Sequence, residues 1–307
     1  MNASLNEILA AAREQGLHLD PERVELDTSG ADFVVAHTAD EQGTRWVLRA
    51  PRGPDVLERV ASERRALELV RPRLPVAVPE WRLFSERLIA YPRLSGDPAA
   101  GVDLDAGGYV WRFDEKAPPP AFLTTLAEAL AALHAVEPGK ARAAGLPVRT
   151  PAEVRAAFAT RMERARALLS VPDVVWRRWQ AWLADDDGLW PEHSVVIHGD
   201  LHPPHILVDD AHRVVGLLDW TEAQVGDPAT DFALLYATLG PDALDVLLEH
   251  YRAAGGRVWP RMAEHVVATW MAFPTVLAEF AQLSGEDGPR QLAQALVDAS
   301  AAEPAGA

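Results

Sequence analysis

The sequence predicts an α+β fold in two lobes, a small β-rich N-terminal lobe followed by a larger helical C-terminal lobe. Three observations predict this arrangement. Residues 1–92 contain short β-like apolar runs together with two helical patterns. Residues 93–120 are rich in Gly, Pro and Asp, which is typical of a hinge, a linker and a loop. From residue 121 to residue 307 the apolar residues recur mostly at helical spacing.

Two helices and four strands are expected in the N-terminal lobe. An amphipathic helix is predicted over residues 5–15, and a second helix over residues 54–71, where Pro54 suits a first helical turn. The first two strands are separated by Asp-Glu-Gln-Gly, a sequence that favours a hairpin. The four predicted strands cover residues 33–36, 45–49, 80–85 and 88–92.

The C-terminal lobe begins with a helical repeat of Phe122, Leu126, Leu130 and Leu133. Residues 195–220 are the exception, because short β runs alternate there with turns. The further helices are predicted over residues 151–169, 173–185, 228–238, 241–254, 259–283 and 288–302.

Composition excludes several classes of protein. The 307 residues correspond to about two domains at ~150 residues each. The net charge is 29 − 45 = −16, which argues against a nucleic-acid partner and permits a cationic ligand. There are no cysteines, which excludes disulfides and thiolate chemistry. No run of ~18 apolar residues and no signal peptide is readable, so we expect a cytoplasmic monomer without a membrane partner.

The densest cluster of chemically active side chains lies in residues 198–220, HGDLHPPHILVDDAHRVVGLLDW. A β run leads to Asp200, His205 follows five residues later, and a second β hairpin ends at Asp219. Phosphoryl transfer needs a carboxylate that accepts a hydroxyl proton and hard ligands that hold Mg²⁺ against phosphates. The spacing matches the catalytic loop and the metal-binding aspartate of kinases.

Two other interpretations of this segment stay open. Three histidines of its first part, His198, His202 and His205, and several aspartates would also suit the transition-metal site of a hydrolase. The spacing of His198 and His202 fits a zinc-binding helix only if the loop is helical, and Gly199, Pro203 and Pro204 argue against a helix. Alternatively, the segment is an ordinary loop whose histidines cap strands.

The motifs HGDLHPPHIL and LLDWTEAQVGDPATDF resemble the aminoglycoside-phosphotransferase superfamily of kinase-like small-molecule kinases. Within it, the chain is most similar to the macrolide 2'-phosphotransferases. The segments WVLRAPR (46–52), LPVAVPEWR…LIAYPRL (74–94) and YRAAGGRVWPR (251–261) share this likeness. The resemblance implies a bilobal protein-kinase-like fold and transfer of a γ-phosphate to the 2'-hydroxyl of a macrolide amino sugar, with Mg²⁺ and with GTP favoured over ATP.

The resemblance also implies roles for individual residues. Asp200 would position and deprotonate the sugar hydroxyl, and Asp219 would hold Mg²⁺. His205 stands where most relatives have Asn and would serve both the metal and the phosphates. His198 and Asp231 would support the catalytic loop; for Asp231, the alternative is an ordinary acid in a first helical turn.

The nucleotide would bind in the N-terminal lobe. Only two lysines exist and both lie in loop-like sequence, so Arg49 is the candidate phosphate-binding cation. Its acidic partner would be Glu63 or Glu58, on the following helix. Ser29 and Gly30 belong to the expected phosphate loop, residues 27–33. The backbone groups of the last strand would contact the purine, at Ile89, Ala90 and Tyr91.

The acceptor site is expected in the C-terminal lobe. A macrolide is a large apolar ring with a cationic amino sugar, so its pocket should be apolar and lined with acids. His202 lies beside Asp200, and the other candidates come from one apolar helix, at Trp270, Phe273, Leu277, Glu279 and Phe280. Two alternatives remain, a kinase of another small alcohol such as an aminoglycoside or a metabolite, and a non-catalytic kinase-like binding module.

Overall fold

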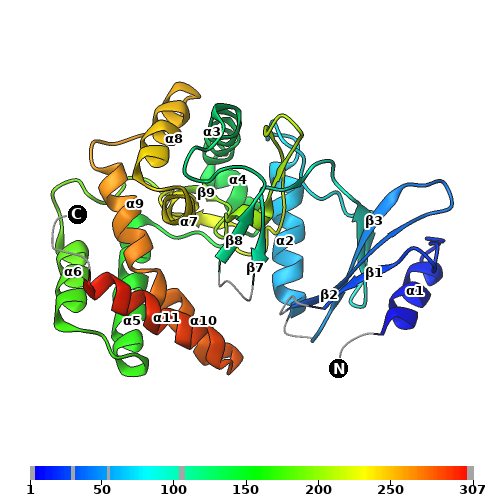
Figure 1. Cartoon of the computed structure of the whole chain (residues 1–307), viewed down its shortest axis with the longest axis horizontal. Helices are drawn as coiled ribbons and strands as arrows, with labels where there is room; N and C mark the ends of the chain where they lie inside the picture. The colour runs from blue at the N-terminus through cyan, green and yellow to red at the C-terminus, as the bar shows by residue number, and fades with distance from the viewer. Residues whose placement is uncertain (1–3, 29–31, 54–55, 104–107, 303–307) are drawn as a thin grey trace.

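A computed structural model describes residues 4–28, 32–53, 56–103 and 108–302. Its N-terminal part is a five-stranded antiparallel sheet with the strand order β1-β2-β3-β5-β4 (Figure 1). The predicted strands are present, and an additional edge strand precedes them. The strands are β1 (Glu25–Asp27), β2 (Phe33–Ala39), β3 (Arg45–Pro51), β4 (Leu83–Phe84) and β5 (Ile89–Pro92).

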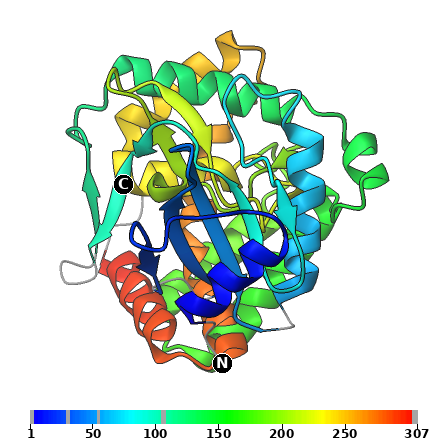
Figure 2. The same cartoon turned by 90° about the vertical axis from the view of Figure 1, so that its right-hand side faces the viewer.

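Two helices pack on opposite faces of this sheet, α1 (Leu5–Glu14) and α2 (Val56–Val70). Alternation along the strands explains this, because successive side chains of a strand point to opposite faces. Leu48 and Ala90 pack with α1, whereas Val47 and Ile89 pack with α2. Figure 2 shows α1 lying across the strands on the side away from the helical part.

The prediction of an irregular linker over residues 93–120 was wrong in part. This segment contains β6 (Asp97–Pro98), β7 (Ala100–Asp103) and β8 (Gly108–Trp111). β7 and β8 form a hairpin, and β6 pairs with β10 (Ile206–Val208), more than 100 residues away in the sequence. The Gly and Pro content conceals such short strands, and long-range pairing leaves no local signal.

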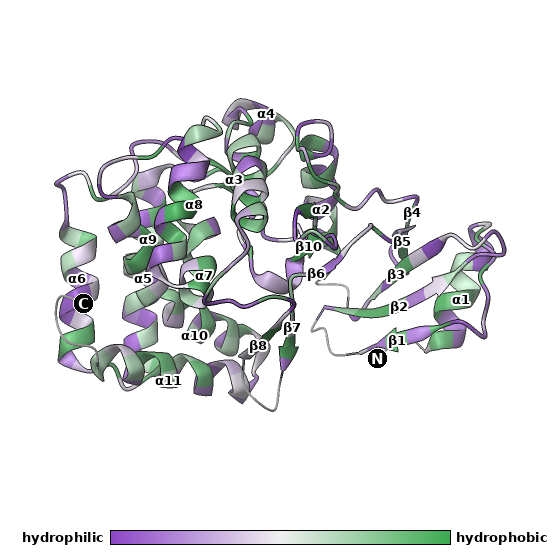
Figure 3. Cartoon of the chain, turned by 45° about the horizontal axis from the view of Figure 1, so that its top comes forward, coloured by the Kyte–Doolittle hydropathy of each residue, from purple (hydrophilic) through white to green (hydrophobic). Residues whose placement is uncertain are grey.

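The C-terminal part is helical, as predicted, and surrounds the short strands β9 (Val195–Ile197), β10, β11 (Val214–Leu217) and β12 (Gln224–Gly226). Figure 3 shows hydrophobic residues along α7, α8 and α10, which contribute to the two clusters of buried apolar side chains in this part. The short helix α4 was not predicted. The helices are α3 (Pro120–His134), α4 (Pro138–Ala143), α5 (Pro151–Leu168), α6 (Asp173–Ala184), α7 (Thr230–Leu239), α8 (Pro241–Ala253), α9 (Met262–Met271), α10 (Phe273–Ser284) and α11 (Asp287–Ala302).

The helix predicted over residues 259–283 is two helices. The break lies at Ala272, which ends α9 and precedes Pro274 in the first turn of α10. Proline has no N–H to donate and is best tolerated at a helix start, which explains the break. Among the described residues, Met262–Ser284 is by length and composition alone apolar enough to cross a membrane, which the sequence analysis did not expect. Core helices of soluble proteins pass the same test, and 39% of its apolar window is buried inside the protein.

Candidate active site

A cleft of about 1120 Å³ lies between the sheet and the helical part. Its walls come from β1, β2, β3 and β5 on one side, and from the segment after β9, the end of β11 and α10 on the other. It brings together residues that are far apart in the sequence. The predicted site residues that line it are Arg49, Tyr91, Asp200, His202, His205, Asp219, Phe273, Leu277 and Phe280.

The loop after β9 is held by one buried carboxylate. Asp231, at the start of α7, accepts hydrogen bonds from the backbone N–H groups of His198 (2.8 Å) and Gly199 (2.9 Å). Gly199 has a φ of 88°, and a Cβ there would lie 2.3 Å from the carbonyl oxygen of Glu222. Only glycine fits this close approach, and the loop is therefore locked in one path that ends at Asp200.

The ring of His198 also holds this loop in place, through two hydrogen bonds. Its Nδ1 accepts the N–H of Asp200 at 3.3 Å, so its Nε2 carries the hydrogen that is donated to the carbonyl of Leu218 at 2.8 Å. The ring is fully buried, and burial lowers its pKa. A neutral His198 thus connects the loop before Asp200 to the residue before Asp219.

His205 lies between the two aspartates. Its Nδ1 donates to the backbone carbonyl of Asp200 (2.9 Å) and lies 3.6 Å from the Asp200 carboxylate. Its Nε2 lies 3.9 Å from Oδ2 of Asp219. Because a carbonyl oxygen only accepts hydrogen bonds, Nε2 is the nitrogen left to bind a metal in the neutral ring.

Asp219 occupies a strained position at the end of the β10–β11 hairpin. Its φ is 57°, a left-handed value that Asp tolerates better than most residues. Burial alone would raise its pKa, but His205, Arg49 and the hydroxyl of Thr221 (2.6 Å) lower the pKa to about 2. The carboxylate is therefore charged at neutral pH. The anionic oxygen of Asp219 is the hard donor that suits Mg²⁺, which keeps several of its own waters, whereas Nε2 of His205 also lies within hydrogen-bond distance of His202.

His202 connects these polar contacts to the β7–β8 hairpin. Its Nε2 lies 3.2 Å from Nε2 of His205, and its Nδ1 lies 3.0 Å from the hydroxyl of Tyr109 on β8. Burial and the neighbouring His205 lower the pKa of His202 to about 4. Asp200, His202 and His205 also lie close enough to share an ion, with ligand atoms within 4.8 Å of one another.

A buried ion pair joins the sheet to α2. Nη1 of Arg49 lies 2.7 Å from Oε1 of Glu63, and both side chains are shielded from water. Burial opposes the charge on Arg49, but attraction from Glu63 raises its pKa overall. Its guanidinium also stacks over the ring of Phe33, 4.0 Å from the centroid. The alternative partner Glu58 is exposed.

Some predicted site residues are not in the cleft. The pairing of β5 with both β3 and β4 occupies the backbone of Ile89 and Ala90, and neither residue lines the cleft, so their purine contacts stay predictions. Glu279 pairs with Arg161 (2.7 Å) and Arg164 (3.0 Å) on α5. Trp270 stacks on Phe273 and does not line the cleft, and Ser29 and Gly30 lie outside the described residues.

Sequence reasoning missed several cleft residues. Arg59 and Asp32 form an ion pair (2.5 Å) in the wall, and Arg93 follows β5 there. Glu222 lies within the DWTEA motif, which was its available signal; burial and then the nearby Asp200 raise its pKa. Tyr109 had no signal, since its contact with His202 spans 93 residues of sequence.

This fold and this cluster define a kinase-like phosphotransferase. Residues 23–265 match the phosphotransferase enzyme family, and the chain belongs to that family. The bilobal protein-kinase-like fold predicted from the sequence is thereby confirmed.

Two solved structures are similar over nearly the whole chain. Macrolide 2'-phosphotransferase MphH from Brachybacterium faecium is 41% identical with a TM-score of 0.86, covering 96% of this chain and 97% of that chain. A macrolide 2'-phosphotransferase type I is 37% identical with a TM-score of 0.87, covering 97% and 98%. The predicted resemblance to this group is confirmed.

Two further relatives broaden the comparison. YcbJ of Bacillus subtilis (strain 168), an uncharacterized protein, is 45% identical over 277 residues, 90% of each chain. The GDP and kanamycin complex of APH(2")-IIia shares the fold, with a TM-score of 0.76 at 18% identity over 96% of this chain and 97% of that chain.

Proposed function

We propose that the protein transfers the γ-phosphate of a purine nucleotide, with GTP favoured over ATP, to the 2'-hydroxyl of a macrolide amino sugar. The observation that carries the proposal is the convergence of Asp200, His205 and Asp219 in one cleft, opposite the Arg49–Glu63 pair. The similarity to two macrolide 2'-phosphotransferases supports the acceptor. The protein would act as a cytoplasmic monomer.

In the proposed reaction, the hydroxyl oxygen of the sugar forms a bond to the γ-phosphorus. The bond from the γ-phosphorus to the bridging oxygen breaks, and the nucleoside diphosphate leaves with that electron pair. The hydroxyl proton passes to the carboxylate of Asp200, whose backbone is fixed by His198 and by the neighbouring Gly199. Such positioning supplies much of the catalysis in phosphoryl transfer.

The nucleotide would lie against the sheet. Arg49 is proposed to fork onto phosphate oxygens, with Glu63 fixing its direction. His205 and Asp219 would hold Mg²⁺, which neutralises charge on the phosphates when it is bound. Ser29 and Gly30 are proposed to cover the phosphates, and Tyr91 lines the wall nearest the purine.

The acceptor would occupy the part of the cleft beside α10. Phe273, Leu277 and Phe280 present an apolar wall that suits a lactone ring, and His202 lies beside Asp200 at its edge. A protonated amino sugar would be attracted by the acidic side chains that line the same cleft, Asp32, Asp200, Asp219 and Glu222. An aminoglycoside carries several charges and no apolar face, and gains nothing from α10.

One assay tests the proposal. The purified protein is incubated with Mg²⁺, GTP or ATP, and panels of macrolides and aminoglycosides, and product is detected as a mass gain of one phosphate. We expect phosphorylated macrolide, faster with GTP, and much weaker binding of a macrolide that lacks its tertiary amine. Phosphorylation of aminoglycosides alone would overturn the macrolide assignment and leave the kinase assignment standing. No transfer to any acceptor, with nucleotide still bound, would favour the binding module.

A further inference from the structure

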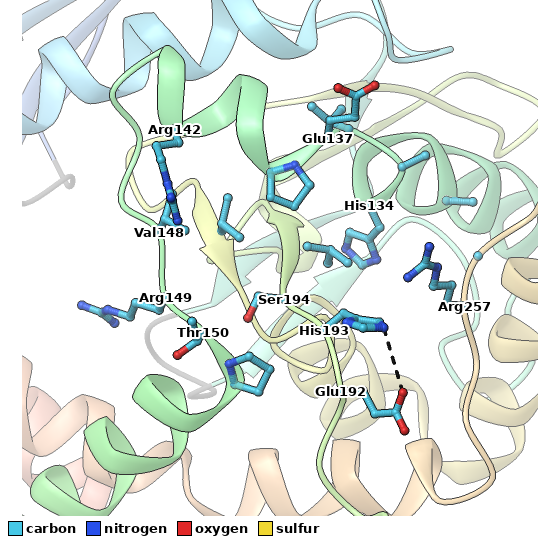
Figure 4. Close-up of a pocket in the computed structure, with 18 of the residues that line it drawn as sticks. His134, Glu137, Arg142, Val148, Arg149, Thr150, Glu192, His193, Ser194 and Arg257 are labelled. Carbon is cyan, nitrogen blue, oxygen red and sulfur yellow. Dashed lines mark ion pairs between the residues drawn. The ribbon is translucent and has the colours of Figure 1, made fainter.

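A second pocket, of about 690 Å³, lies in the helical part and shares no residue with the cleft (Figure 4). It is formed where the ends of α3 and α8 meet the starts of α4 and α5 and the strands β9 and β12. Four valines are among its lining residues and form what we call its floor. These are Val136, Val148, Val195 and Val225.

Three arginines from three separate segments line this pocket: Arg142 from α4 and Arg257 after α8 on opposite sides, and Arg149 before α5, whose side chain extends outward (Figure 4). All three are exposed, and none forms an ion pair within the part of the chain that the structure describes. Two acids also lie on the rim: Glu137 pairs with Lys140 at 3.4 Å, and Glu192 lies 4.0 Å from Nε2 of His193. Arg149 and Arg142 also act electrostatically on Glu153, whose pKa is lowered chiefly by its hydrogen bonds with Thr150 and further by these two arginines.

We propose that this second pocket binds an amphiphilic organic anion, with its oxyanion at the arginine rim and its apolar body on the valine floor. Guanidinium groups form charge-assisted, forked hydrogen bonds with oxyanions, and they lose less hydration than ammonium groups when they do so. A small hydrophilic anion would leave the four valines in contact with water. The combination of charge and apolar surface therefore selects ligands that carry both.

The wall of the second pocket is connected to the catalytic loop by hydrogen bonds. The hydroxyl of Tyr251 lies 2.9 Å from Nδ1 of His134, and Nε2 of His134 donates to Asp231 at 3.1 Å. Asp231 is the carboxylate that holds the N–H groups of His198 and Gly199. His134 and Tyr251, which line the pocket, are thus two and three contacts away from the loop that ends at Asp200.

The backbone next to Arg257 contacts the ring of Tyr251, the residue at the pocket end of this hydrogen-bonded path. A Cβ at Gly256 would lie 2.3 Å from the ring of Tyr251, so the backbone rests directly on that ring. An anion that fixes Arg257 also fixes this backbone, and with it the hydroxyl of Tyr251. Occupancy of the second pocket therefore orders the catalytic loop, with Tyr251 and His134 as positioning residues.

The binding test uses the full chain and 8-anilinonaphthalene-1-sulfonate, an aromatic sulfonate that fluoresces on apolar surfaces. We compare the wild type with R142Q/R149Q/R257Q and with a matched control, R13Q/R45Q/R177Q, whose arginines are equally exposed and lie elsewhere. Saturating GTP and Mg²⁺ are present to fill the cleft. We expect the first variant to weaken binding ~10-fold or more and the control to stay within about twofold. Equal affinity in the wild type and the first variant, or equal loss in both variants, overturns the proposal.

The coupling test measures hydrogen–deuterium exchange of the peptide that contains His198 and Gly199, with and without the sulfonate. We expect slower exchange when the second pocket is occupied in the wild type. Tyr251→Phe keeps the ring and removes the hydroxyl, so it should bind the sulfonate equally well and lose this slowing. Unchanged exchange in the wild type, or the same slowing in Tyr251→Phe, overturns the coupling. Regulation of turnover by this path rests on the proposed function, whereas both readouts are independent of activity.

Discussion

Arg49 and Glu63 form an ion pair of 2.7 Å that is buried between β3 and α2. Among the described residues, neither side chain has another charged partner as near, and each charge offsets the cost of burying the other. A buried pair of this kind adds little to stability compared with apolar side chains, but the loss of one partner is costly. The pair therefore fixes the position of the Arg49 guanidinium, which lines the cleft.

Glu63→Leu should lower the free energy of unfolding by about 3–5 kcal/mol, because it leaves the charge of Arg49 buried without a partner. Urea unfolding of both proteins measures the difference. The control is Glu68→Leu on the same helix, which breaks an exposed pair with Arg64 worth at most about 1 kcal/mol. Equal destabilisation by the two substitutions would contradict the role of burial.

Asp200→Asn should reduce turnover by at least ~10² while leaving nucleotide affinity nearly intact, because the amide cannot accept the hydroxyl proton. The hydrogen bonds that hold the loop come from the backbone of Asp200 and survive the change. Steady-state kinetics and nucleotide titration give the two quantities. Near-normal turnover would remove Asp200 from the role of base.

Asp219→Asn should abolish the Mg²⁺-dependent part of nucleotide binding, because it removes the anionic oxygen that suits the metal. Asn is preferred to Ala here since it tolerates the φ of 57°. Nucleotide affinity measured with and without Mg²⁺ reports the effect. Asp209→Asn, at the turn of the same hairpin, is the control and should keep the Mg²⁺ response. An intact Mg²⁺ response in Asp219→Asn would indicate that the histidines, and not Asp219, hold the metal.

Stability should fall as the pH drops below about 6.5. Burial lowers the pKa of His198 and lowers that of His202 to about 4, so the unfolded chain takes up protons in this range while the folded rings stay neutral. The stabilisation is complete above pH ~6.5 and is lost progressively toward pH ~4. Urea unfolding at pH 5 and pH 7 measures it. The drop should be smaller in His198→Gln, and an identical drop would exclude His198 as a contributor.

The sequence predicted the cluster well where its members lie close together in the chain. Asp200, His205 and Asp219 fall within twenty residues, so spacing alone indicated how strands and turns would bring them together. Arg49 was reached by a different route, since only two lysines exist and both are in loop-like sequence. The choice between Glu58 and Glu63 depends on which face of α2 is turned toward the sheet, and only the packing of the helix decides that.

Long-range pairing explains the misses. β6 pairs with β10 across the molecule, and Tyr109 reaches His202 only because the β7–β8 hairpin lies beside the catalytic loop. Glu279 was expected to face a ligand but faces two arginines of α5, more than 110 residues away. Ile89 and Ala90 differ, because β4 is the neighbouring strand that the sequence predicted, and its local pairing with β5 occupies their backbone.

The contact between Gly199 and the carbonyl of Glu222 has a consequence for how such an enzyme can change. The first segment carries Asp200, the proposed base, and the second follows directly from Asp219, the proposed metal ligand. With no room for even a methyl group between them, neither segment can shift without displacing the other. Substitutions that fit the cleft to a new acceptor must therefore lie outside these two segments. The exposed end of α10 is one such place, where Phe280 and Leu283 are 40% and 82% accessible. Under the proposed function, a change of acceptor range would therefore need substitutions in α10 first and in these two loops last.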